Sequence, residues 1–412
     1  MRDVWILTGV IAFFGLANGL MINVTPQDAL VLGFSSAEIG RIGIGIPIGY
    51  AGGCLLLWGL SGRLHGKGVP LCGILGAMAA VLLMAQARTV NACVAAQILF
   101  GLASGAFWPF MSAWLLEFQS DSLGKQRLLR HYNVGWTTGA STGLFLAGVL
   151  CKNGLIQETL YGATGVLAAV FVAACCAKSG RGAQGDSPSR ARKQAVGPLP
   201  YGRASGTQAP HARGIGLPLL VAAVSVNMAA LGTRGMILYN YPELNEKLGF
   251  FADRMGLLTA LTLVAQLAAF GFGSVYEPWL GLRRLYIFMA AALAGINLAF
   301  AYSNSLAVLV PAVLLHGLVL AVAFQTGIFA ATLYFAAPRT GTTFHEATVG
   351  VAGVAILAAG QVAAYLQHTG MDPVPALRAP FLLMIGVIAV VLVMQLVLVS
   401  LRNHQRVLLP SE

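Results

Sequence analysis

The stretch GLMINVTPQDALVLGFSSAEIG, residues 19–40, returns in related form at residues 235–256 as GMILYNYPELNEKLGFFADRMG. The two stretches share six of 22 positions, whereas ordinary residue frequencies would give about one or two identities. The same offset of 216 residues relates the Leu-X-Gly-Leu pattern of residues 99–102 to that of residues 315–318. The chain therefore consists of two homologous halves.

The composition places both halves in a membrane. Of the 412 residues, 57% are hydrophobic and 9% are charged, and the mean hydropathy is +0.77. A helix needs about 20 apolar residues to cross a bilayer. Twelve apolar runs approach that length, near residues 4–23, 38–60, 70–86, 91–116, 131–150, 156–177, 217–240, 254–272, 285–302, 306–335, 346–367 and 378–401. We predict an all-α membrane protein with twelve transmembrane helices in two pseudo-symmetric six-helix bundles, an arrangement typical of transport proteins.

The basic residues orient the predicted helices. If both termini are cytoplasmic, 18 of the 25 Lys and Arg residues lie on that side, six lie outside, and Arg234 lies within a run. The positive-inside rule favours this orientation. It predicts a multi-pass protein of a cell membrane, which we expect to be a bacterial inner membrane. The net charge of +11 then reflects topology and attraction to lipid headgroups, and it requires no nucleic-acid partner.

One segment differs in kind from the rest of the chain. Residues 178–216 are rich in Gly, Ser, Pro, Ala and Arg and show no apolar periodicity. Such a composition is typical of a flexible linker. The predicted organisation is an N-terminal six-helix bundle at 1–177, a basic cytoplasmic linker at 178–216 and a C-terminal bundle at 217–412.

The segment between the second and third runs carries a partial motif. Gly59, Gly66 and Lys67 match a Gly, a second Gly and a basic residue in a motif of the major facilitator superfamily. The chain also resembles this superfamily in its twelve apolar runs, its parallel repeat and its basic central loop. The acidic and basic positions of that motif are occupied by Arg63 and Leu64 instead. The resemblance implies the superfamily fold, and it puts the usual acidic latch at Arg63 in doubt.

The resemblance also implies gates at the cytoplasmic helix ends. The candidate gating residues are Arg63, Lys67, Arg130, Glu277 and Glu346. We expect Glu346 to pair with Arg130, Arg339 or another basic loop residue.

Glycines follow one face of several runs. In the fifth run they are Gly135, Gly139, Gly143 and Gly148, and in the eleventh they are Gly350, Gly353 and Gly360. Helices approach closely where side chains are missing. We interpret these stripes as packing surfaces.

Arg234 is the leading candidate for a functional residue. A central Arg costs about 2.5–3.5 kcal/mol on insertion scales, so it needs a partner, a cavity or a function. Its repeat counterpart is Asn18, and we expect the two side chains to face each other across the cavity. The alternative is that Arg234 extends toward the membrane surface or pairs with a carbonyl.

Other polar and aromatic side chains lie within the runs. In the resembling family the first, fourth, seventh and tenth helices line the cavity, which favours Asn18, Trp108, Arg234, His316 and Gln325. The full set of candidate substrate-binding residues is Asn18, Trp108, Asn133, Trp136, Arg234, His316 and Gln325. His316 could instead be a hydrogen-bonded structural residue, and Trp108 could mark a helix kink.

Carboxylates are scarce within the runs. All fourteen acidic residues are expected in loops or near run ends, with Glu117 and Glu346 closest to the membrane. A co-transported proton is therefore one option, with His316, His131, Glu346 and Glu117 as possible carriers. Transport without a coupling ion is the other.

The favoured function is a secondary transporter that moves a small organic solute, anionic or sugar-like, by alternating access. Arg234 favours such solutes because a guanidinium only donates hydrogen bonds. The alternatives are a proton-driven exporter of drugs or metabolites and, in another class, a membrane scaffold or sensor that does not transport. We expect no enzyme, cofactor or metal site, because no nucleophile–base pair, ligand cluster or phosphate loop is visible. A monomer is expected.

Removing about ten residues from the 178–216 linker should leave transport intact, because the free energy of loop closure changes only slowly with length. Uptake into cells at matched membrane levels is the measurement. Loss of membrane insertion after this deletion would show that the segment packs as part of the fold.

Overall fold

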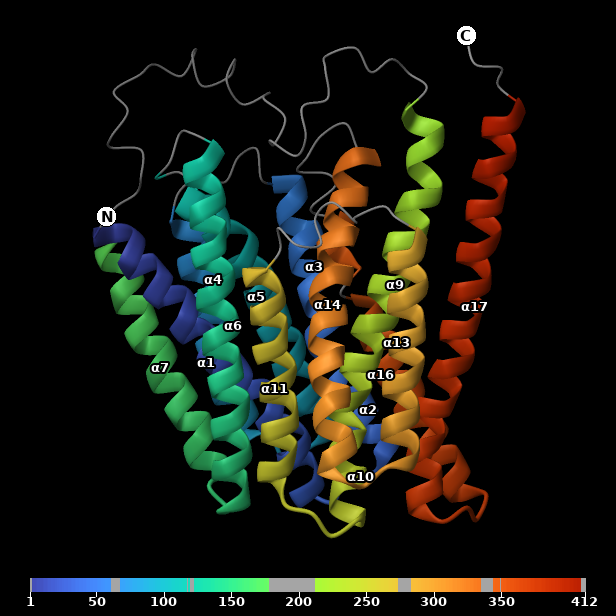
Figure 1. Ribbon diagram of the computed structural model, residues 1–412. Coiled ribbons are helices and arrows are strands. Elements are labelled where there is room, and N and C mark those ends of the chain that lie inside the picture. The colour runs from blue at the N-terminus through green and yellow to red at the C-terminus, as the bar shows by residue number, and fades with distance from the viewer. Residues whose placement is uncertain are drawn as a thin grey trace.

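The structure is a computed structural model and describes residues 2–60, 67–116, 118, 122–177, 212–272, 283–334, 344–348 and 350–408. Within these residues the regular structure is entirely helical, and the helices run side by side between two ends of the molecule (Figure 1). Most of the 178–216 linker lies outside the described residues, as do Arg63, Glu117, Glu277 and Arg339.

The first half contributes seven helical segments: α1 (Arg2–Val31), α2 (Ser36–Gly43), α3 (Gly45–Leu60), α4 (Gly68–Gln86), α5 (Val90–Leu116), α6 (Ser122–Lys152) and α7 (Ile156–Cys176). The second half contributes α9 (Ala212–Tyr239), α10 (Tyr241–Lys247), α11 (Ala252–Gly271), α13 (Arg283–Tyr302), α14 (Leu306–Tyr334), α16 (Gly350–His368) and α17 (Pro373–Leu408).

Eleven segments of the described chain are long and apolar enough to cross a membrane, which confirms a multi-pass protein. They coincide with eleven of the twelve predicted runs. The remaining run, 346–367, coincides with α16. The count of twelve spans therefore stays a prediction.

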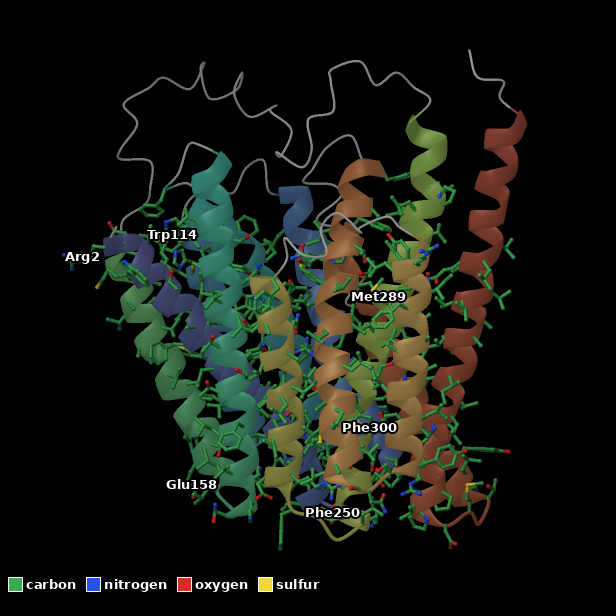
Figure 2. All side chains as sticks on the ribbon, in the orientation of Figure 1. Arg2, Trp114, Glu158, Phe250, Met289 and Phe300 are labelled. Atoms are coloured by element: carbon green, nitrogen blue, oxygen red, sulfur yellow. The ribbon has the colours of Figure 1, made fainter. Side chains whose placement is uncertain are left out.

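The first residue of α1 and the last turn of α17 lie at the same end of the bundle (Figure 1). We call the opposite end, where α1 stops at Val31 and α6 stops at Lys152, the far end. In Figure 2, Arg2 marks the end with the termini, and Glu158 and Phe250 mark the far end. If the termini are cytoplasmic, as the basic residues predict, the far end faces outward.

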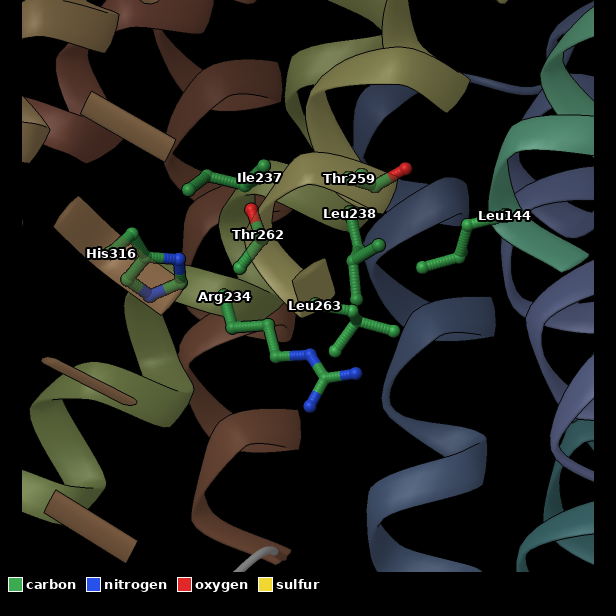
Figure 3. Close-up of a pocket in the computed structure, with 8 residues that line it drawn as sticks. All are labelled: Leu144, Arg234, Ile237, Leu238, Thr259, Thr262, Leu263 and His316. Atoms are coloured by element: carbon green, nitrogen blue, oxygen red, sulfur yellow. The ribbon is translucent and has the colours of Figure 1, made fainter. Parts of the chain in front are cut away.

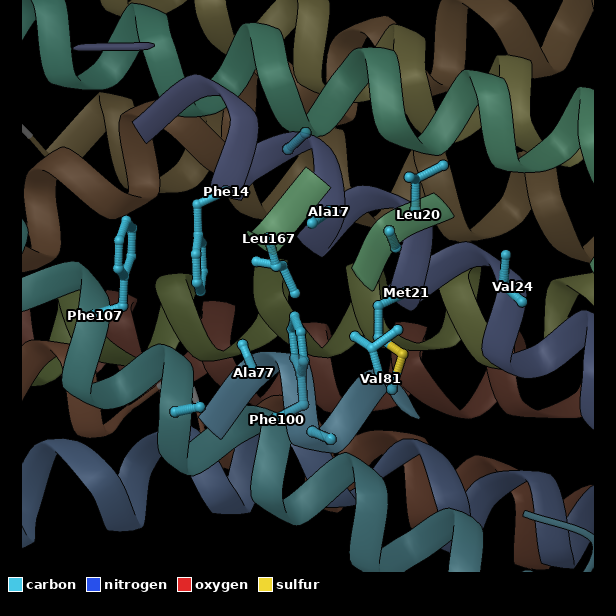
Figure 4. Packing of buried hydrophobic residues seen from close by; sticks show 14 of the residues in the cluster. Phe14, Ala17, Leu20, Met21, Val24, Ala77, Val81, Phe100, Phe107 and Leu167 are labelled. Carbon is cyan, nitrogen blue, oxygen red and sulfur yellow. The ribbon is translucent and has the colours of Figure 1, made fainter. Parts of the chain in front are cut away.

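The buried apolar side chains form two clusters. The first is drawn mainly from α1 to α7, and its rings Phe14 and Phe107 stack with centroids 3.7 Å apart (Figure 4). The second is drawn from helices of the second half and includes Tyr241, Phe300 and Phe381. Each half therefore has an apolar core of its own.

The 216-residue repeat extends to the helix ends. Four described glycines have positive φ angles, and they form two pairs at this offset: Gly33 (75°) with Gly249 (77°), and Gly154 (75°) with Gly370 (90°). Each glycine follows the last turn of a helix, and the amide of the next residue returns to a carbonyl five positions earlier. This is the left-handed helix end that glycine adopts without strain.

Glycines also decide how closely the helices approach. In α6, Gly139 and Gly143 lie against the backbone of α1 at Ala12 and Leu16, so these members of the predicted stripe are packing residues. Gly148 faces the other half: a methyl group added there would lie 2.7 Å from the Cα of Gly256 on α11. The two halves thus meet backbone to backbone at this point.

A matching contact joins the halves on the other side of the interface. A methyl group added to Gly360 of α16 would lie 2.9 Å from the Cα of Gly40 on α2. Gly40 and Gly256 are repeat partners at the 216-residue offset. Both halves therefore use the same glycine to contact the other half, and both contacts lie toward the far end.

Gly148→Leu should separate the far ends of the two halves. Overpacking of this kind costs about 1–3 kcal/mol, so the ratio of separated to closed molecules should rise by about fivefold to more than a hundredfold. The distance between spin labels placed on the two halves at the far end measures this change. Gly165→Leu is the matched control, because a side chain added to Gly165 of α7 meets no atom within 4 Å. An unchanged distance in Gly148→Leu would contradict the prediction.

Candidate functional site

A narrow pocket lies between the two halves around Arg234. Its walls are Arg234, Ile237 and Leu238 of α9, Thr259, Thr262 and Leu263 of α11, His316 of α14 and, from the first half, Leu144 of α6 (Figure 3). Its free space is about that of one water molecule. Any larger solute therefore requires the halves to move apart.

Arg234 brings a full positive charge to this pocket. Its side chain extends from α9 into the pocket, away from His316 (Figure 3). Among the described residues its guanidinium has no hydrogen-bond partner and no carboxylate partner, and the one ion pair they form is Lys152 with Asp253. A charge held inside the membrane without a partner is expensive, so the five donors of Arg234 are available to a ligand.

His316 supplies a hydrogen-bond acceptor, in contrast to the donors of Arg234. The side chain is fully buried, and its Nε2 lies 3.2 Å from the carbonyl oxygen of Ala230. Because a carbonyl only accepts, Nε2 carries the proton and Nδ1 carries the lone pair. Nδ1 has no partner among the described residues. The hydrogen bond to Ala230 fits the alternative interpretation of His316 as a structural residue. Its Nδ1 also makes His316 a hydrogen-bond acceptor in the pocket wall.

Two threonines complete the polar lining. The hydroxyl of Thr259 donates to the carbonyl of Met255 at 2.9 Å, and that of Thr262 donates to Leu258 at 3.1 Å. Their hydrogens are used within α11, so their oxygens can only accept from a ligand. The spacing of three residues puts both on one face of the helix, a signal that was visible in the sequence and was overlooked there.

Three of the predicted site residues lie together in the first half. Trp108 and Trp136 are 6.4 Å apart between ring centroids, and Trp136 Nε1 donates to Asn133 Oδ1 at 3.3 Å. Trp136 also lies 6.5 Å from Phe270 of α11, which is 6.5 Å from Phe324 of α14. A row of aromatic rings therefore crosses from one half to the other.

The structure separates the remaining predicted site residues from the pocket. Asn18 is half-buried on α1 and does not line the pocket, which Leu144 of α6 closes from the first half. The described residues show no hydrogen bond between Asn18 and Arg234, and the expectation that the two side chains face each other across the cavity stays a prediction. Gln325 is half-buried beside Phe324 and also lies outside the pocket lining.

At the far end, polar side chains of the two halves contact each other beyond the two glycine contacts. Ser36 of α2 donates to Glu243 of α10 at 2.7 Å, and Gln367 of α16 donates to Ser36 at 3.2 Å. On the other side, Lys152 and Asp253 form an ion pair of 2.8 Å. These contacts close the far end in this structure, and the sequence alone did not indicate them.

Two of the acidic residues that were expected in loops or near run ends are buried near helix ends. Asp28 and Glu243 are 3% and 7% exposed. The reason is helix length, because α1 continues to Val31 and α10 prolongs α9 to Lys247. Both helices extend beyond the apolar runs from which their ends were predicted, and they carry carboxylates into buried positions.

The described gating candidates have partners of different kinds. Lys67 donates to the carbonyls of Cys175 and Ala177, at the end of α7 in its own half. Glu346 instead accepts a hydrogen bond of 2.9 Å from Tyr50 of α3, so its described partner is a phenol of the opposite half. Arg130 lies in α6, but its side chain is outside the described part.

No family model and no curated protein matches the sequence. Solved structures match it in fold. The nucleoside transporter NupG covers 97% of this chain and 99% of its own with a TM-score of 0.74 and 13% identity. The human organic anion transporter MFSD10 (TETRAN) covers 96% and 99% with a TM-score of 0.62 and 14% identity. The POT family transporter PepTSo covers 98% of each chain with a TM-score of 0.66 and 14% identity.

These structures are transporters of the major facilitator type, and the chain therefore has the major facilitator superfamily fold. The similarity confirms the predicted all-α membrane fold of this superfamily, and the twelve spans and the cytoplasmic termini stay predictions.

The Tyr50–Glu346 hydrogen bond should contribute measurably to holding the halves together. Tyr50→Phe and Glu346→Gln should each lower the thermal stability of the purified protein, and the double variant should be less destabilised than the sum of the two. The expected coupling is about 1.5–3 kcal/mol, the range for a hydrogen bond to a charged group. Purely additive effects would show that the bond contributes nothing in solution.

Proposed function

We propose that this protein is a secondary transporter that moves a small organic solute across the membrane by alternating access. The observation that carries the proposal is the guanidinium of Arg234, which has no partner among the described residues and lies in a pocket formed between two homologous halves. A pocket at such an interface can open to either side of the membrane when the halves rock against each other. The fold shared with known solute transporters supports this reading.

The chemistry of the pocket favours an anionic solute that also carries a hydrogen-bond donor. Arg234 would bind a carboxylate or a comparable group through its fork of donors. Thr259, Thr262 and His316 Nδ1 would accept hydrogen bonds from a hydroxyl or amino group of the same solute. A hydroxylated organic acid satisfies both sides of the pocket. The organic anion transporter among the similar structures is consistent with this class.

A neutral, hydroxylated solute such as a sugar or nucleoside is the second candidate. It is favoured by the number of acceptors in the pocket wall and by the similarity in fold to a nucleoside transporter. A cationic drug fits poorly, because Arg234 would repel it and the described residues that line the pocket include no carboxylate. A scaffold or sensor that does not transport would leave the charge of Arg234 without a use.

The proposal includes the remaining features of the sequence prediction. In this proposal the chain crosses a bacterial inner membrane twelve times, with both termini on the cytoplasmic side. Residues 1–177 and 217–412 move as two bodies joined by the linker. The functional unit is a monomer surrounded by lipid. The contacts from Ser36 to Glu243 and from Lys152 to Asp253 form the outer gate.

A graded series at Arg234 tests the proposal. Arg234→Lys keeps the charge and loses the planar fork, Arg234→Gln keeps donors without charge, and Arg234→Leu removes both. For an anionic solute, uptake into vesicles containing the purified protein should fall in the order Lys, Gln, Leu. The Leu variant should lose about tenfold to a hundredfold, since a charged hydrogen bond contributes about 1.5–3 kcal/mol.

A panel of organic acids, sugars and nucleosides, offered with and without a proton gradient, supplies the solutes. His368→Gln serves as a control, because this exposed residue at the end of α16 is distant in sequence and role from the pocket. Equal anion uptake by the Leu variant at equal protein content would end the anion interpretation. Absence of uptake of every class by the wild type would favour the scaffold.

A further inference from the structure

Two arginines at the far end of the second half meet at a single residue, Asn304, in the turn between α13 and α14. Arg254, in the first turn of α11, donates from Nη2 to the backbone carbonyl of Asn304. Arg378, in the second turn of α17, donates from Nη2 to the side-chain Oδ1 of the same asparagine at 2.6 Å. The hydroxyl of Tyr241 is within electrostatic range of both. The two guanidinium groups are therefore neighbours.

Neither arginine forms an ion pair in the described part of the chain. Asp253 precedes Arg254, but its carboxylate pairs with Lys152 at 2.8 Å. Asp372 is exposed just before α17, and the described ion pairs do not include it. Each guanidinium has five donors, and the bonds to Asn304 use one of each. Two adjacent positive charges repel each other, so a bound anion would stabilise this pair.

The internal repeat indicates that the turn does not need the two arginines in order to form. The turn between α13 and α14 begins and ends at the same repeat positions as the turn between α4 and α5. At the positions of the two arginines the first half has Glu38 and Gly162. At the position of Asn304 it has Arg88, which donates to backbone carbonyls at the end of α4. The arginine pair is thus an addition of the second half.

The surface around Asn304 has the character of a membrane boundary. Tyr302, Leu306 and Val308, on both sides of this turn, are exposed. Tyrosine is enriched where lipid headgroups meet the hydrocarbon, and exposed aliphatic side chains on a spanning helix face acyl chains. The turn therefore lies at the depth of the headgroups.

The arginines themselves are accessible from this surface. Both Arg254 and Arg378 are half-buried, and neither lines the pocket around Arg234. The guanidinium carbon of Arg254 lies 3.6 Å from the ring centroid of Phe250, which is at the far end in Figure 2. This stacking holds the plane of the guanidinium in place. The ligand of the arginine pair is thus distinct from the transported solute.

We infer that Arg254 and Arg378 form a binding site for the phosphate group of an anionic phospholipid in the membrane leaflet at the far end. The planar fork of a guanidinium matches the oxygens of a phosphate. An anionic lipid brings a net negative charge, whereas a choline lipid brings its own cation to the same place. The acyl chains would lie along the exposed side chains of α13 and α14. This site goes beyond the proposed transport function and does not depend on it.

Lipid binding to the purified protein tests the inference. Phosphatidylglycerol and phosphatidylcholine with identical acyl chains are titrated, and native mass spectrometry measures the lipid that stays bound. The wild type should retain phosphatidylglycerol more tightly. The double variant Arg254→Gln, Arg378→Gln should bind it about tenfold to a hundredfold more weakly, because each charged hydrogen bond contributes at least about tenfold. Equal binding of the two lipids by the wild type would overturn the inference.

A control variant separates this site from general attraction between charges. Arg41→Gln with Lys247→Gln removes two positive charges from exposed positions at the same end of the molecule. This control should keep the tight binding of phosphatidylglycerol. If the control and the arginine double variant lose binding to the same extent, the effect is one of net charge, and the site is refuted.

Asn304→Asp tests the site without removing either arginine. The new carboxylate would lie between the two guanidinium groups and supply the missing anion from within the chain. The variant should be at least as stable to heat as the wild type in phosphatidylcholine, and it should lose the preference for phosphatidylglycerol. If the arginines only hold the turn together, the preference should survive in this variant, which would contradict the inference. This comparison also decides the case in which the arginine double variant does not fold.

Soluble phosphates distinguish a lipid from a free ligand. Inorganic phosphate and glycerol 3-phosphate, added at the same concentrations as the lipid, should neither bind comparably nor displace phosphatidylglycerol, because they lack acyl chains. Displacement by either compound in the wild type, but not in Asn304→Asp, would make the arginine pair a site for a soluble phosphate and overturn the assignment to lipid. None of these measurements uses a transported solute, so their outcome is independent of the proposed function.

Discussion

The close approach of backbone to backbone between the two halves is the constraint on which the rest of the structure depends. At Gly40 with Gly360, and at Gly148 with Gly256, there is no room for a side chain. These contacts bring α11 against α6, and only then do Arg234, Thr259 and Leu144 line one pocket. They also bring Tyr239 of the second half to Gln97 of the first half. The same packing of the two halves therefore closes the far end and forms the pocket.

Charge inside this closed bundle is divided between two places. Arg234 sits at the interface without a described partner and needs an anion or an acceptor from a solute. Asp28 sits near the far end within the first half, where its Oδ2 has no hydrogen-bond partner among the described residues. Separation of the halves would let water reach Arg234 and lower the cost of its charge.

Much of the fold could be predicted from the chain because it is local or periodic. Apolar runs long enough to span a bilayer become helices, since backbone groups in lipid must bond within their own segment. The repeat at an offset of 216 residues reappears in the paired helix ends at Gly33 and Gly249. Arg234 could be selected because charge is rare in such runs. Helix ends were less predictable. Asp28 and Glu243 are buried because helical turns continue past the ends of the predicted apolar runs.

Partners across the interface could not be predicted from the chain. Asn18 is the repeat counterpart of Arg234, yet Leu144 of α6 closes the pocket in its place, and Tyr50 is the described partner of Glu346. A repeat relates positions within each half, whereas the contact between halves depends on the tilt and rotation of packed helices. The sequence by itself determined the helices, the two halves and the unusual charge. The tertiary structure alone decided which side chains meet, because contacts between distant segments depend on packing that no local pattern encodes.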